Sequence, residues 1–137
     1  MKTPAFLHPS VVLFLHDEAL AAFGGIPGIR DEGLMLSALA RPENSLAYSD
    51  PGTVDIFDLA TSYAFGIASN HPFADANKRT AWSSCVTFLA RNGHQLSVSA
   101  DAVVDMMVAL ASHRCDEPTF AAWLRTIARP QSPGAVP

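Results

Sequence analysis

Two helix-length stretches of the sequence carry no charged side chain, and they flank a short polar cluster. Residues 59–70 contain no Asp, Glu, Lys or Arg, and neither do residues 80–90. Burying an unpaired charge is costly, so a helix without charge is normally enclosed by other elements. The two stretches therefore predict two buried helices in the middle of a domain, with the polar cluster at the connection between them.

Helical patterns recur along the rest of the chain, whereas alternating strand patterns are short and β-branched residues are few. The sequence predicts an all-α fold, a compact bundle of about six helices with a buried central helix directly after the polar cluster. The expected helices cover residues 12–23, 31–41, 56–70, 75–91, 99–110 and 116–127.

Cap and turn residues set several of these boundaries. The first helix should end at Gly24, and Asp31 should cap the second helix. Pro42 cannot continue a helix without losing a hydrogen bond, so the second helix is expected to end at Arg41. Residues 43–53 then form a loop. The buried face of the first helix is expected to comprise Val12, Leu15, Ala19 and Phe23.

The chain of 137 residues, 49% of them hydrophobic, fits one domain with a sizeable core. We assign residues 1–129 to this domain and expect residues 130–137, which are rich in proline, to form a flexible tail. The net charge of −4 and the scattered cations offer no basic face for nucleic acid. Neither a secretion signal nor an apolar span of about 20 residues is evident, so we expect a cytoplasmic protein without membrane contact.

Cysteine and histidine spacings indicate no zinc site. Cys85 and Cys115 lie far apart among apolar residues, which is typical of free, reduced thiols. His16 and Asp17 fall on the polar side of the first expected helix, so we expect both at the surface. The remaining histidines outside the cluster show no ligand spacing among themselves, and they are His8, His94 and His113.

The polar cluster reads HPFADANKR and covers residues 71–79. Pro72 should end the preceding helix, so Lys78 and Arg79 fall in the first turn of the next one. Cations at that place oppose the helix dipole and cost ~0.3–1 kcal/mol each. A bound anion would reverse the sign of this cost, which favours a phosphate site. For Lys78 an exposed lysine at a helix start remains the alternative.

Other residues of the cluster could supply the remaining chemistry of phosphate transfer. His71 is suited to removing a proton from a hydroxyl near neutral pH. Asp75 could bind Mg²⁺, which holds nucleotide phosphates through one or two carboxylates. Asn77 can donate a hydrogen bond to an oxyanion, and Phe73 should pack inward and fix the loop. Taken singly, Asp75 and Asn77 also suit the simpler role of helix caps.

This cluster resembles the signature of the Fic/Doc family, His-x-Phe-x-Asp/Asn-Gly/Ala-Asn-Gly/Lys-Arg. The segment GGIPGIRDEGLMLSALARP is similar to the upstream part of Doc ("death on curing") toxins, and NKRTA with the following apolar helix and RNG resembles their central helix. The likeness covers roughly residues 7–127. It implies that His71 is the base, that Asp75 coordinates Mg²⁺ with the phosphates of ATP, and that Asn77 and Arg79 form the anion site.

Two departures from the Fic pattern indicate the Doc branch. Fic enzymes that transfer AMP usually have glycine at the position of Lys78 and a second arginine at the position of Trp82. Doc members are understood to bind the nucleotide reversed and to transfer the γ-phosphate, which makes Lys78 a phosphate contact. The resemblance thus implies a kinase that modifies a threonine of elongation factor Tu and halts translation. An AMP transferase, and an inactive antitoxin-binding module that helps to repress its operon, stay open as alternatives.

The resemblance also bears on regulation. Many Fic proteins carry an inhibitory helix with the pattern Ser/Thr-x-x-x-Glu-Gly/Asn, and none of the glutamates outside the cluster fits it: Glu18, Glu32, Glu43 and Glu117. A separate antitoxin of the Phd type is therefore implied as the partner, with a disordered segment that folds onto the toxin. The family also has a target-docking flap near the site, which we place at residues 43–53.

Overall fold

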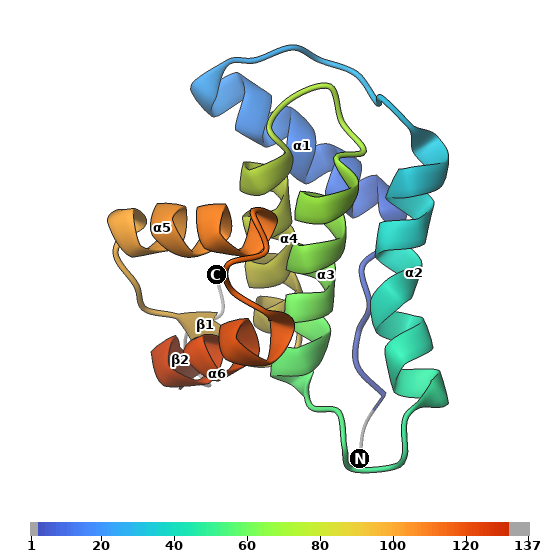
Figure 1. Ribbon diagram of the computed structural model, residues 1–137, viewed down its shortest axis with the longest axis vertical. Coiled ribbons are helices and arrows are strands. Elements are labelled where there is room, and N and C mark those ends of the chain that lie inside the picture. Colours follow the sequence, from blue (N-terminus) through green and yellow to red (C-terminus); the bar gives the residue numbers. More distant parts are fainter. Residues whose placement is uncertain (1–2, 132–137) are drawn as a thin grey trace.

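The computed structural model of the protein describes residues 3–131. In this range it confirms the predicted all-α fold, with six helices and one small two-stranded sheet (Figure 1). The helices are α1 (Pro9–Phe23), α2 (Glu32–Tyr48), α3 (Ile56–Asn70), α4 (Asn77–Arg91), α5 (Ala100–Ala111) and α6 (Glu117–Ile127). The strands are β1 (His94–Leu96) and β2 (Ala128–Pro130).

The two helices that lack charge through most of their length lie at the centre of the bundle, as the sequence predicts. Helices α2, α4 and α6 pack around α3, while α1 and β1 pack against α4, and α5 contacts both central helices. Tyr63 of α3 and Phe88 of α4 are fully buried, with ring centroids 5.1 Å apart. The Tyr63 hydroxyl accepts a 2.9 Å hydrogen bond from the backbone N–H of Leu7, and burial raises the pKa of Tyr63 to about 12. The chain before α1 is thereby tied to the core.

Helix α2 does not end at Arg41, as the sequence predicted, but continues through Pro42 to Tyr48. The predicted loop at residues 43–53 is therefore wrong over its first half. A proline inside a helix costs about 3 kcal/mol because it removes a hydrogen bond and crowds the preceding turn. Contacts with other helices must offset this cost.

Close packing of α2 against its neighbours supplies these contacts. Pro42 is itself buried. One turn earlier, Ala38 lies so near Gly66 of α3 that a Cβ added to this glycine would be 3.2 Å from the Ala38 side chain. Arg41 forms an ion pair of 2.9 Å with Glu117 at the start of α6. Tertiary packing thus overrides the local preference for a helix end.

Helix α1 buries a face that is shifted from the predicted one. Val12 and Ala19 are buried as expected, but the buried residue between them is His16, which is 3% exposed. Phe23, which was expected in the core, is 72% exposed. The prediction that His16 lies at the surface was therefore wrong. Its ring finds a hydrogen-bond acceptor and an aromatic partner in the loop after α3, which makes burial of this polar side chain favourable.

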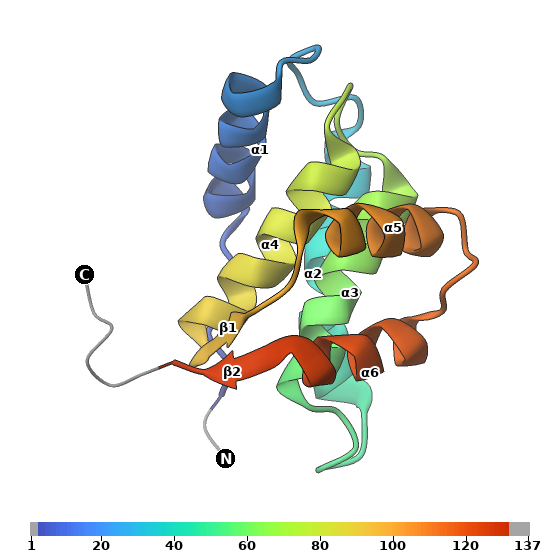
Figure 2. The same cartoon turned by 90° about the vertical axis from the view of Figure 1, so that its left-hand side faces the viewer.

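The short sheet was not predicted, and it pairs the segment after α4 with the segment after α6 (Figure 2). Strands β1 and β2 are antiparallel, with His94 opposite Pro130. The backbone N–H of Gln131 donates to the carbonyl of Gly93 at 3.0 Å. Backbone pairing therefore extends slightly beyond residue 129, where we expected the domain to end. The rest of the expected tail, residues 132–137, lies outside the described residues.

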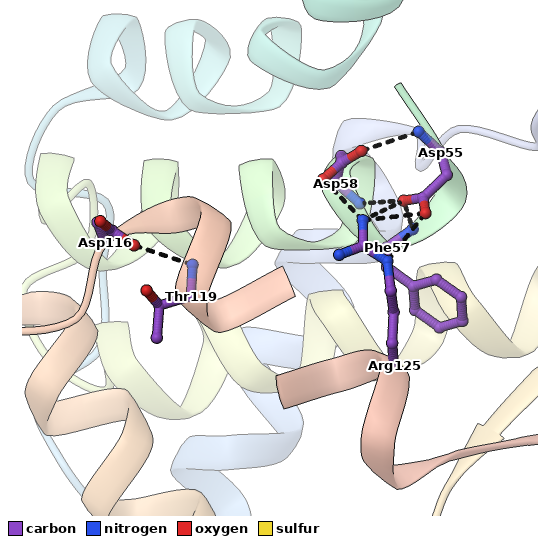
Figure 3. Close-up of polar contacts among 6 residues, drawn as sticks. All are labelled: Asp55, Phe57, Asp58, Asp116, Thr119 and Arg125. Carbon is purple, nitrogen blue, oxygen red and sulfur yellow. Dashed lines mark hydrogen bonds and ion pairs between the residues drawn. The ribbon is translucent and has the colours of Figure 1, made fainter. Parts of the chain in front are cut away.

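A charged clamp fastens α6 to the start of α3 (Figure 3). Asp55 caps α3 by accepting hydrogen bonds from the backbone N–H groups of Phe57 and Asp58. The Arg125 guanidinium donates two hydrogen bonds of 3.0 Å to Asp55 and one more of 3.0 Å to Asp58. Burial by itself would raise the pKa of Asp55, but the hydrogen bonds from Arg125 and Asp58 outweigh it and lower that pKa below its ordinary value.

Both cysteines are free and buried, as predicted. Burial raises the pKa of the Cys85 and Cys115 thiols, which keeps them protonated and unreactive. Within residues 3–131, none of the helices combines the length and the apolar character needed to cross a bilayer.

Candidate active site

The polar cluster forms the connection between α3 and α4 at one end of the bundle (Figure 1). The segment that links α1 to α2, residues 24–31, runs beside it. The backbone N–H groups of Arg30 and Asp31 donate to the carbonyl of Pro72 at 2.7 and 3.0 Å. A further backbone N–H, that of Ala74, donates to the linking segment at 3.1 Å. Residues 24–31 thus brace the cluster along its length.

The flap that we placed at residues 43–53 does not lie beside the cluster. Residues 43–48 belong to α2, and the turn after them is at the opposite end of α3 (Figure 1). At 1.5 Å per residue, the length of α3 separates the two ends by about 22 Å. The exposed stretch beside the cluster is residues 24–31, where Ile29 forms an antiparallel bridge with Phe73.

Two residues with left-handed backbone stand at the two ends of the loop between α3 and α4. His71 has φ 49° and ψ 55°, and Ala76 has φ 63° and ψ 29°. This region costs a non-glycine residue about 1–2 kcal/mol, so nearby contacts must hold the turn. The Asn77 side chain accepts a hydrogen bond from the N–H of Phe73 and donates one to its carbonyl, both at 3.0 Å. The buried Thr80 hydroxyl donates to the Ala76 carbonyl at 2.8 Å.

The exposed imidazole of His71 lies at the end of α3, and residues of other segments hold the backbone of His71 in place. The guanidinium of Arg30 donates to the carbonyls of His71 and Asn70, at 2.7 and 2.8 Å. The Asn70 side chain in turn donates to the carbonyl of Leu34 at 3.0 Å. These bonds hold the backbone of His71 in place and leave its exposed ring accessible to a hydroxyl group.

The Asp75 carboxylate is held by backbone N–H groups on both sides. One oxygen accepts from Ile26 at 3.1 Å and the other from Ala76 at 2.8 Å. These two hydrogen bonds, with the positive charge of Arg79, lower the pKa of Asp75. Gly25 makes the close approach possible, because a Cβ there would lie 2.9 Å from the carboxylate. The group is therefore anionic at neutral pH and oriented.

The first turn of α4 presents unpaired donors and two cations. Its N-cap residue, Ala76, offers no side-chain cap, so the backbone N–H groups that follow have no intrahelical partner. Lys78 and Arg79 are exposed in this turn. The guanidinium of Arg79 lies over the ring of Phe23 in α1, 4.8 Å from its centroid, which fixes its direction by a cation–π contact.

These side chains surround one small hollow of about 280 Å³. A hollow of this size suits phosphate groups, since drug-sized ligands occupy pockets of about 300–1,000 Å³. Every site residue expected from the sequence lines it: His71, Asp75, Asn77, Lys78 and Arg79. The structure brings all of them together, and their roles remain a matter for proposal.

Asp75 suits a magnesium ion that is shared with phosphates. Each carboxylate oxygen accepts one backbone hydrogen bond and keeps lone-pair capacity for a cation. Among residues 3–131, His, Cys, Asp and Glu form no group of three that could enclose a metal. Mg²⁺ typically combines one or two carboxylates with water and substrate phosphates. A single carboxylate in a hollow that is also lined by two cations fits that mode of binding.

Several residues that shape the site escaped the sequence analysis. Gly25 leaves room for Asp75, 50 positions later, and Arg30 holds His71, 41 positions later; no local pattern links either to the cluster. For His16 a signal was present, since positions 12, 16 and 19 also define one helix face. We placed the apolar Leu15 on the buried face instead of His16.

A loop with a histidine that leads into a cationic helix start is suited to a phosphate group, and comparison with known sequences identifies the family. The chain belongs to the Fic/DOC family, whose sequence model matches residues 6–89. It is 33% identical to "Protein kinase doc" of Escherichia phage P1 over 121 residues, 88% of this chain and 94% of the relative. It is 39% identical to "Toxin Doc" of Mycolicibacterium smegmatis over 105 residues, 75% of this chain and 80% of the relative. The resemblance to Doc toxins is thereby confirmed.

Proposed function

We propose that this Doc-type toxin is a protein kinase that moves the γ-phosphate of ATP to a threonine hydroxyl of elongation factor Tu and so halts translation. The observation that carries the proposal is the hollow at the start of α4, lined by a histidine, a carboxylate and two cations. The relative from phage P1 is named a protein kinase, which supports transfer of phosphate. The choice of threonine and of elongation factor Tu rests on the family resemblance.

In the proposed reaction His71 is the general base. A ring nitrogen takes the proton of the hydroxyl as the hydroxyl oxygen attacks the γ-phosphorus. The bond between the γ-phosphorus and its bridging oxygen breaks, and ADP leaves. Because Arg30 holds the backbone beneath His71, the imidazole can meet an incoming hydroxyl with little reorganisation.

Anion binding falls to the first turn of α4. Its free N–H groups, with Lys78 and Arg79, would hold the phosphate oxygens. Asp75 would hold Mg²⁺, which supplies positive charge to the transferring group when bound. Asn77 closes the turn through Phe73 and retains one amide hydrogen for a phosphate oxygen.

The residue at position 82 favours phosphate transfer over AMP transfer. In AMP-transferring relatives of the Fic branch, an arginine here would share a helix face with Arg79 and clamp a second phosphate. Trp82 is instead half-buried, with its ring 5.7 Å from that of Trp123 in α6. The second clamp is absent from this position, so a single phosphate at the hollow is the better match.

Labelled ATP distinguishes the two enzyme reactions. The protein, Mg²⁺ and elongation factor Tu are incubated with ATP labelled on either the γ- or the α-phosphorus, and the mass added to the factor is measured. Label from the γ position with the mass of one phosphate is the expected result, whereas α label with the mass of AMP would establish the alternative transferase. His71→Ala should abolish transfer. His94→Ala is the control, because that ring packs on Phe57 at the far end of α3.

An inactive module that only binds the antitoxin is the alternative from another class. Expression without antitoxin separates the two, because an enzyme should arrest growth and an inert binder should not. The arrest should disappear with His71→Ala. Growth arrest that persists in this variant would contradict catalysis by His71.

An antitoxin partner accompanies Doc-type toxins, and one groove suits a segment of it. The groove, of about 830 Å³, lies between α1, α4 and α5. Its lining is mainly apolar, Phe23 and Val104 are exposed on it, and Arg79 lines both this groove and the phosphate hollow. An amphipathic helix with a carboxylate near Arg79 would complement the groove and obstruct the hollow.

Val104→Arg should then weaken antitoxin binding by about tenfold or more without reducing phosphate transfer. Unchanged affinity would place the antitoxin elsewhere.

A further inference from the structure

Helix α1 carries a buried histidine that the proposed reaction does not use. His16 is 3% exposed, and its Nε2 lies 2.9 Å from the backbone carbonyl oxygen of Asp75. A carbonyl oxygen can only accept a hydrogen bond, so Nε2 is the donor. The same ring stacks on Phe73, with centroids 3.9 Å apart and an angle of 11° between the planes.

These contacts fix two points of the loop, one on each side of Ala74. Phe73 is 1% exposed beneath the His16 ring. Asp75 is held at both ends, because α1 holds its carbonyl through His16 and the turn after α1 holds its carboxylate through Ile26. A change in the Asp75 peptide plane would swing the carboxylate away from the hollow, so the backbone bond bears on the side chain.

We propose that His16 is a positioning residue that orients the Asp75 carboxylate for a magnesium ion by holding the Asp75 peptide. The proposal rests on the proposed function, in which Asp75 binds Mg²⁺ together with nucleotide phosphates. Partners that orient metal ligands typically contribute 10–100-fold to metal affinity. Because His16 acts through the backbone rather than on the carboxylate itself, we expect about tenfold, the lower end of that range.

Three substitutions of His16 separate the hydrogen bond from simple packing. His16→Gln can place an amide nitrogen near the position of Nε2, whereas His16→Asn has one methylene fewer and cannot reach the carbonyl. His16→Phe keeps the stacking on Phe73 and loses the donor. Val12→Ala is the matched control, because it weakens the same buried face of α1 one turn earlier and removes no hydrogen bond to the loop.

The first measurement uses the protein without nucleotide or metal. Hydrogen exchange is followed at the backbone N–H groups of Ile26 and Ala76, which both donate to the Asp75 carboxylate. We expect His16→Asn and His16→Phe to speed exchange at both sites by about tenfold. His16→Gln and Val12→Ala should stay close to the wild type at these sites, even if Val12→Ala unfolds more readily overall.

The second measurement is the Mg²⁺ concentration that gives half-maximal ATP binding by calorimetry and half-maximal phosphate transfer. The Asn and Phe variants should need about tenfold more Mg²⁺, with kcat at saturating Mg²⁺ within about threefold of the wild type. A merely structural role would lower stability without this split. The inference is overturned if exchange and Mg²⁺ requirement in these variants match those of Val12→Ala. If the wild type itself binds no magnesium nucleotide, the proposed function fails, while the exchange measurement still judges the role of His16.

Discussion

Replacing Gly25 by alanine would test whether the position of the Asp75 carboxylate controls the site. A Cβ on Gly25 would lie 2.9 Å from a carboxylate oxygen of Asp75, whereas ordinary contacts begin at 3.4 Å. The oxygen must therefore retreat by about 0.5 Å to restore normal contact. Its hydrogen bond from Ile26, now 3.1 Å, would lengthen to about 3.6 Å, at which distance it is lost.

The expected effect falls on magnesium-dependent binding rather than on folding alone. Loss of a hydrogen bond that orients a metal ligand typically costs 10–100-fold in metal affinity, so we expect roughly tenfold weaker binding of the magnesium nucleotide. The backbone adds a separate cost, because Gly25 has φ +131° and a side chain in such a conformation is strained by about 1–3 kcal/mol. The effect of this backbone strain must be separated from the effect of the displaced carboxylate.

Gly28→Ala is the control variant for the backbone strain. Gly28 has φ +113°, and a Cβ there would meet nothing within 4 Å, so this variant carries the strain without the clash. Urea denaturation of both variants, with calorimetric titration of magnesium ATP, separates stability from binding. We expect Gly25→Ala to lose at least as much stability as Gly28→Ala, and a tenfold affinity loss in Gly25→Ala only. Equal affinities for the two variants would refute the argument that the glycine makes room for the carboxylate.

Three further predictions concern the fold around the site. Arg125→Ala should lower the free energy of unfolding at pH 7 by about 0.5–1 kcal/mol, since the clamp is partly exposed. The pKa of Asp55 is held below 3.8 in the folded protein, so the stabilisation from Asp55 exists above this value and is lost as pH falls through the folded pKa. In acid unfolding scans the variant should therefore lose less stability than the wild type as pH falls. Ala76→Gly should raise stability by about 1 kcal/mol, because it relieves a left-handed backbone, and thermal unfolding will show an increase in Tm. Cys85 should resist thiol reagents in the native protein and react on unfolding, because burial raises its pKa; rapid labelling of the native thiol would contradict its burial.

The central pair of helices could be predicted because their signals are local. Two uncharged stretches mark α3 and α4, and Pro72 separates them. The residues that line the hollow could be located for the same reason, since nine consecutive positions contain all of them. Chemistry that is concentrated in one short segment can be read without knowing what surrounds that segment.

The remaining features depend on contacts between distant parts of the chain. The helix through Pro42 persists because α3 packs against it and Glu117 of α6 pairs with Arg41, and nothing near Pro42 in sequence reveals those partners. His16 is buried because a loop some 60 positions later accepts its hydrogen bond. Strands of three residues, such as His94–Leu96, are too short to show alternation. Each of these features is decided by tertiary structure rather than by local preference.

The pairing of β1 with β2 brings the two ends of residues 97–127 together, so this excursion, which contains α5 and α6, starts and ends at the same place on the domain. The family match ends at residue 89, before this excursion begins, and the phosphate hollow is lined wholly by residues before it. α5, by contrast, supplies one wall of the groove that we assign to the antitoxin. A chimera that carries this excursion from a relative, joined at β1 and β2, should therefore bind the antitoxin of that relative while it keeps the phosphate hollow of its own chain.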